Sequence, residues 1–174
     1  MLTLKCTKKV QTLFGVKRAD LSEAQEEDSV FGAWYVNEFN IGRSRSLIFM
    51  SERTLLSFIL FDVKKVKCHK ERLPELCVRG LIQLLLLEGT PDAQMRRVID
   101  ECIPSRYANT TSKSVLGNLS ELMWHYEDSI LEDGGFERCN LNEILCQINR
   151  IPQRNIGWNK AIDVTRDWLH IHTV

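Results

Sequence analysis

The segment of residues 33–61, AWYVNEFNIGRSRSLIFMSERTLLSFILF, decides the fold class of this 174-residue chain. Residues 33–40 are rich in aromatic side chains, and residues 47–50 and 55–61 form two apolar runs. Short polar connectors with turn-forming residues separate the three runs. Consecutive strands joined by such short links pair as antiparallel neighbours, so the segment predicts an antiparallel meander.

Most of the remaining chain has helical periodicity. Residues 2–6 alternate between apolar and polar and predict one more short strand, after which Thr7 can cap a brief helix over residues 8–14. A polar connector over residues 17–29 precedes the meander. Downstream, apolar spacing and Gly or Pro punctuation predict helices over residues 73–87, 92–102, 114–130, 140–148 and 158–170.

These elements predict a single α+β domain over residues 1–174. A small antiparallel sheet from the N-terminal half is expected to pack against a C-terminal helical layer. The helix over residues 73–87 is apolar on faces too wide for solvent, so we expect it to be the central buried helix.

Composition excludes several classes of protein. The formal net charge is zero, so no overall field attracts nucleic acid or a membrane, although residues 43–72 are locally basic. No apolar run is long enough to cross a membrane, and the N-terminus lacks the apolar core of a secretory signal. We therefore expect the six cysteines to be reduced thiols and the chain to be cytoplasmic.

Motifs for metal binding and catalysis are missing from the sequence. There is no Cys-x-x-Cys pair, and His170 and His172 stand at the end of the chain. No Gly-x-Ser-x-Gly is present, and His125 follows Glu121 at the spacing of an exposed helical charge pair. The sequence thus predicts no catalytic residues, no metal and no cofactor.

A hydroxyl-rich segment, NTTSKSVLGN over residues 109–118, leads into the helical pattern that begins at Ser114. Such a helix start either caps a structural helix or holds an anion, because its free amides carry partial positive charge and Lys113 adds a full one. It lacks the glycines of a P-loop, so nucleotide hydrolysis of that type is not supported. Gly117 costs about 1 kcal/mol in a helix, which suggests that another backbone or a ligand lies close to it.

The segment SERT over residues 51–54 is the second candidate. It is either an ordinary hairpin tip or a wider turn with a role in recognition, since a tight tip would favour glycine or asparagine. Both candidate segments adjoin apolar elements that hold them in place. We therefore expect them to converge in space, with Arg53 and Lys113 supplying positive charge to one site.

Three segments together resemble the signature blocks of an uncharacterised bacterial family, domain of unknown function 6933. They are WYVN at residues 34–37, LIFMSERTLL at residues 47–56 and TTSKSVLGN at residues 110–118, with CTKK at residues 6–9 as a further match. The resemblance covers nearly the whole chain and implies one fold and the position of a site, but no activity. Lys113 stands where the family pattern has arginine, which retains the charge without the bidentate fork.

We expect a non-enzymatic binding or interaction protein of bacterial or mobile-element origin, which binds an anionic ligand or an acidic protein partner. One alternative is an enzyme or sensor acting on a phosphorylated small molecule or nucleotide at the Lys113 helix start. Another is a nucleic-acid-binding accessory protein that uses residues 43–72. The predicted ligand- or partner-binding residues are Trp34, Asn37, Glu52, Arg53, Thr54, Thr110, Lys113, Ser114 and Asn118.

Overall fold

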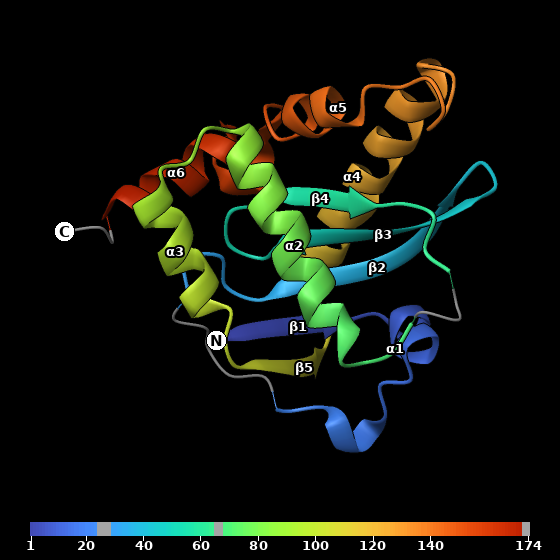
Figure 1. Ribbon diagram of the computed structural model, residues 1–174, viewed down its shortest axis with the longest axis vertical. Helices are drawn as coiled ribbons and strands as arrows, with labels where there is room; N and C mark the ends of the chain where they lie inside the picture. Colours follow the sequence, from blue (N-terminus) through green and yellow to red (C-terminus); the bar gives the residue numbers. More distant parts are fainter. Residues whose placement is uncertain (24–28, 65–67, 172–174) are drawn as a thin grey trace.

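A computed structural model describes residues 1–23, 29–64 and 68–171, built around a five-stranded sheet in the order β4-β3-β2-β1-β5 (Figure 1). The strands are β1 (Leu2–Cys6), β2 (Trp34–Ile41), β3 (Ser44–Ser51), β4 (Ser57–Leu60) and β5 (Ser105–Asn109). Strands β2, β3 and β4 pair antiparallel in sequence order, which confirms the predicted meander.

The sheet is mixed rather than wholly antiparallel. Strand β1 lies between β2 and β5 and runs parallel to both, with Leu4 opposite Trp34 on one side and Tyr107 on the other. The sequence did not predict β5, because this strand is short, largely polar and fully buried only at Ala108. It joins the sheet through distant backbone partners, beginning with the Leu2 amide, which donates to the Pro104 carbonyl at 2.9 Å.

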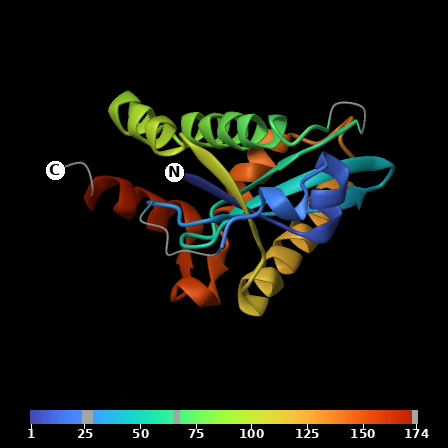
Figure 2. The same cartoon turned by 90° about the horizontal axis from the view of Figure 1, so that it is seen from below.

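Helices cover both faces of the sheet. Helices α2 (Arg72–Leu87) and α3 (Asp92–Glu101) lie on one face, and α4 (Lys113–Glu132) lies on the other (Figure 2). Side chains alternate between faces along a strand, so Phe58 of β4 lies against Gly80 of α2 while its neighbour Ser57 bonds Tyr126 of α4. The α+β class is confirmed, and the helical layer is divided in two because the central strands are apolar on both faces.

Helix α2 is the buried helix that the sequence predicted. Its inner face is covered completely, and the side chains buried there are Leu73, Cys77, Leu81, Leu84 and Leu85. The last turn leaves Leu86 and Leu87 exposed, and Gly89, at φ 72°, ends the helical path in the left-handed region.

The remaining elements are α1 (Lys8–Phe14), η1 (Arg18–Asp20), α5 (Leu141–Ile148), β6 (Pro152–Gln153), η3 (Arg154–Ile156), β7 (Asn159–Lys160) and α6 (Ala161–Ile171). The predicted start of the last helix at Trp158 is wrong. Trp158 has φ 62°, which no helix accepts, and the next two residues pair with β6. Helix α6 therefore begins at Ala161.

Some predictions fall outside the described residues. These are residues 24–28 of the polar connector, residues 65–67 of the basic stretch, and His172. Within the described ranges, no helix combines the length and the apolar character needed to cross a membrane.

Candidate functional site

The two predicted segments are connected through Lys5 and Tyr35. The Lys5 ammonium pairs with the Glu52 carboxylate at 2.8 Å and lies 5.3 Å from the centre of the Tyr35 ring. The Tyr35 hydroxyl in turn accepts hydrogen bonds from the amides of Thr111 and Ser112, at 3.4 and 3.1 Å. A continuous chain of contacts thus links the 51–54 turn to the start of α4, and its end at the turn is Glu52.

Arg53 contacts another part of the molecule. Its guanidinium lies 4.6 Å from the centre of the Trp168 ring on α6, and it also donates to the Ser29 carbonyl. Stacking on an aromatic face is a favourable role for arginine, and it holds the 51–54 turn against α6. The sequence predicted that Arg53 and Lys113 supply charge to one site. Arg53 instead contacts Trp168 and Ser29.

Three other predicted residues hold the fold together. Trp34, 1% exposed, packs against Phe31 and Phe58. The fully buried Thr54 shares a hydrogen bond of 3.0 Å with the Ser51 hydroxyl inside the turn. The side-chain oxygen of Asn37 accepts from the Thr7 hydroxyl at 2.7 Å, and Thr7 is the N-cap residue of α1, although its side chain makes no capping hydrogen bond.

The start of α4 is capped and also open to solvent. The Ser112 hydroxyl accepts from the Val115 amide at 3.3 Å, so the interpretation as a structural cap is correct. Together with Tyr35, this cap satisfies three amides around the helix start. Among the described residues, the amides of Lys113 and Ser114 have no acceptor outside the helix, as expected for the first turn.

Asn155 joins this helix start from η3, far along the chain. Its side-chain amide donates to the Asn118 oxygen at 2.6 Å and lies 3.4 Å from the Ser114 hydroxyl. Asn155 was not among the residues predicted from the sequence. The sequence feature that could have indicated it is the polar turn before Gly157, a glycine with φ 68°. Two of the predicted residues, Ser114 and Asn118, thus fix a second loop in place.

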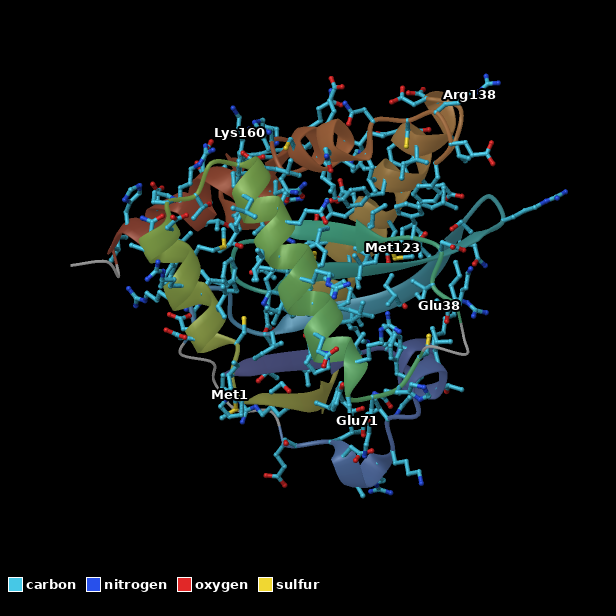
Figure 3. All side chains as sticks on the ribbon, viewed as in Figure 1. Met1, Glu38, Glu71, Met123, Arg138 and Lys160 are labelled. Atoms are coloured by element: carbon cyan, nitrogen blue, oxygen red, sulfur yellow. The ribbon has the colours of Figure 1, made fainter. Side chains whose placement is uncertain are left out.

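The loop that Asn155 anchors carries further exposed residues. Arg154, Trp158 and Lys160 belong to it, and Trp158 is 68% exposed. Figure 3 shows Lys160 at the periphery of the molecule. We call the polar residues around the start of α4 the α4-start surface, and they are Thr110, Lys113, Ser114, Asn118, Asn155 and its chain neighbour Arg154.

The α4-start surface is positively charged. Lys113 and Arg154 form no ion pair with any carboxylate in the described part of the chain. Gly117 borders it, and apart from the nearby backbone of its own helix no described atom lies within 4 Å of the position that a methyl group on Gly117 would take. No other described segment therefore lies against Gly117, contrary to the prediction of a neighbouring backbone, and no described residue fills the space beside this turn of the helix.

Ion pairs partly neutralise the basic stretch of residues 43–72, which the sequence suggests as an alternative nucleic-acid-binding region. Arg45 pairs with Glu38 at 3.0 Å, and Lys64 lies 3.8 Å from Asp62. Lys70 pairs with Asp20, an interaction that lowers the pKa of the carboxyl and raises that of the ammonium through their shared hydrogen bond. These cations are engaged within the chain.

Metal and thiol chemistry find no support in the described residues. No group of three or more His, Cys, Asp or Glu side chains among them is arranged to hold a metal ion. Burial raises the pKa of the Cys6 thiol to about 12 and that of Cys102 to about 11, which opposes formation of the nucleophilic thiolate.

Comparison with known proteins gives a family and no activity. The sequence model of the family described as Domain of unknown function (DUF6933) matches residues 3–164. None of the curated proteins matches the chain.

Proposed function

We propose that this chain, which belongs to the family Domain of unknown function (DUF6933), is a non-enzymatic binding protein that holds an anionic group of its ligand at the α4-start surface. The observation that carries the proposal is the hydrogen bonding of Asn155 to Asn118 and Ser114. Because Arg154 precedes Asn155 in the chain, these bonds support its backbone lying near the start of α4, where Lys113 has no acidic partner among the described residues.

Three physical effects favour an anion there. A helix N-terminus stabilises a negative charge by about 0.3–1 kcal/mol, and the Lys113 and Ser114 amides supply donors. Lys113 and Arg154 add full positive charges. The Tyr35 hydroxyl and the Ser112 cap hold the helix start rigidly, so little conformational entropy is lost when a ligand binds.

The anionic group is a carboxylate or a phosphate, and the loop that carries Arg154 also carries the exposed Trp158. An acidic protein partner and a phosphorylated small molecule both present such a group. A sensor of a phosphorylated molecule would use the same residues. We propose binding rather than catalysis because the residues of this surface include no His, Cys, Asp or Glu.

The experiment is a thermal-shift and titration series with inorganic phosphate, a nucleoside diphosphate and an oligoglutamate peptide at low and moderate salt. We expect at least one probe to raise the melting temperature, with an effect that weakens as salt screens it. Lys113→Gln combined with Arg154→Gln should weaken that binding about tenfold.

The matched control is Arg43→Gln combined with Arg138→Gln, which removes the same charge from exposed positions elsewhere. Binding should be unchanged in this variant. If both double variants bind the probe equally more weakly than the parent, net charge alone explains the binding. If none of the three probes binds, the proposal is wrong.

The cytoplasmic location and the bacterial or mobile-element origin expected from the sequence belong to this proposal. Support for the location comes from the cysteines, all six of which are free thiols, four of them buried. Alkylation of the denatured, unreduced protein checks their reduced state.

A further inference from the structure

A groove of about 1200 Å³ lies on the opposite side of the sheet from α4. Helices α2 and α3 diverge over the end of the sheet and leave β5 between them without a helix above it (Figure 1). The Tyr107 ring of β5 lines the groove, and the loop after α3 forms its outer lip with Ile103, which is 72% exposed. This groove shares no residue with the α4-start surface.

Two rows of side chains run along the α2 wall. Pro74, Val78 and Ile82 follow each other at intervals of one helical turn and make an apolar row. Glu71, Glu75 and Arg79 repeat at the same interval and make a charged row beside it. Ile99 and Ile103 present a second apolar row from the α3 side.

The groove is held open by contacts within its walls. The Tyr107 hydroxyl donates to the Lys70 carbonyl just before α2, and the Lys70 ammonium pairs with Asp20 of η1. The Ser22 amide donates to the Tyr107 carbonyl at 2.8 Å and so fixes the segment after η1 to β5. Walls fixed in this way need no rearrangement before a partner docks.

We infer that this groove docks an amphipathic helix of a partner protein, whose apolar stripe is flanked by basic residues. Two apolar rows separated by an aromatic floor match the stripe that such a helix presents at i, i+3, i+4 and i+7. Glu71 and Glu75 favour basic residues beside the stripe, because both are exposed and form no ion pair with a described residue. Figure 3 shows Glu71 at the start of α2, where a basic flank would meet it.

The other charged side chains of the groove either contact residues of this chain or lie farther along α2. Lys70 is paired with Asp20, and Arg106 donates to the Thr3 hydroxyl at 2.8 Å. Arg79 stands two turns beyond Glu71 and would meet an acidic residue of the partner helix. The charged row therefore also gives the docked helix a preferred direction.

The test uses two synthetic helical peptides of the length of α2, with the same leucine stripe flanked by lysines in one and by glutamates in the other. Fluorescence anisotropy with the intact protein should show binding of the lysine peptide and much weaker binding of the glutamate peptide. Glu71→Gln combined with Glu75→Gln should weaken the lysine peptide about fivefold. Ile103→Ser should weaken it about tenfold.

The matched controls are Glu137→Gln and Leu131→Ser, which change an exposed acid and an exposed aliphatic side chain away from the groove. Neither should alter peptide binding, and Lys113→Gln with Arg154→Gln should also leave it intact, since the two sites are separate. Equal affinity for the two peptides, no binding of either, or a dimer of the parent that Ile103→Ser dissociates would each overturn the inference.

Discussion

Tyr35 shows how one buried side chain connects segments that are far apart in the sequence. Its ring supports the Lys5 ammonium, and its hydroxyl accepts hydrogen bonds from two amides ahead of α4. Asn155 does the same at the surface by bonding Ser114 and Asn118. The position of the proposed anion site therefore depends on these two residues as much as on Lys113 itself.

The six thiols differ in the accessibility that controls their chemistry. Cys6, Cys68, Cys77 and Cys102 are buried, whereas Cys139 and Cys146 are partly exposed. Burial raises the pKa of Cys77 far above the usual value for a thiol, so both access and thiolate formation are opposed there.

We predict that iodoacetamide at pH 8 labels Cys139 and Cys146 of the folded protein well before the other four. Denaturation without a reductant should then release all six thiols for labelling, because we expect no disulfide. Intact mass and peptide mapping give both readouts. Rapid labelling of Cys77 in the folded protein would contradict its burial, and fewer than six labels after denaturation would contradict the cytoplasmic location.

At the level of elements, the contact between α2 and the sheet depends on Gly80. A methyl group at this position would lie 2.2 Å from the nearest ring atom of Phe58, closer than carbon atoms approach. For Gly117 in α4, no described atom beyond the nearby backbone of its own helix lies within 4 Å of the equivalent position. The same residue type thus permits close packing in one helix and only lowers helix propensity in the other.

Gly80→Ala should lower the free energy of unfolding by about 1–3 kcal/mol, because overpacking outweighs the gain in helix propensity. Gly117→Ala should raise it by up to about 1 kcal/mol, since only the propensity changes. Urea denaturation measures both. Adding Phe58→Leu to Gly80→Ala should recover part of the loss, and stabilisation by Gly80→Ala alone would show that α2 does not pack this closely.

For the molecule as a whole, Glu88 ties three helices together. Its carboxylate is fully buried at the end of α2 and accepts from Arg150 after α5 at 2.7 Å and from Arg166 of α6 at 3.2 Å. The arginine side chains are 44% and 43% exposed, so the two ends of this cluster differ in their access to water.

Removing the arginines should therefore cost more than removing the acid. Arg150→Ala with Arg166→Ala leaves a buried carboxylate without an ion pair and should lower the free energy of unfolding by about 3–5 kcal/mol. Glu88→Gln keeps the volume and leaves arginines that can return to water, so about 1–2 kcal/mol is expected. Urea denaturation at pH 7 measures the free energy of unfolding of both variants, with Arg43→Ala and Arg138→Ala as controls. A larger loss for Glu88→Gln than for the double arginine variant would show that the carboxylate reaches water.

The local sequence pattern was sufficient to predict the meander of β2, β3 and β4, the buried helix α2 and the capped start of α4. Each depends on neighbours a few residues away: apolar runs with short links, helical spacing, or a hydroxyl before the first turn. The proposal that Lys113, Ser114 and Asn118 belong to a site has the same local basis. Periodicity of this kind survives in a single sequence because it reflects burial of one continuous segment.

The tertiary structure alone placed β5 in the sheet, divided the helices between two faces and brought Asn155 to α4. These features depend on partners that are distant in sequence, such as the Leu2 amide with the Pro104 carbonyl and Asn155 with Asn118. Trp34 and Thr54 look like site residues in the sequence but are buried, because which side of a strand or turn faces the core depends on what packs against it. A hydrogen bond across tens of residues leaves no periodic signal, so only the folded chain shows which polar groups remain for a ligand.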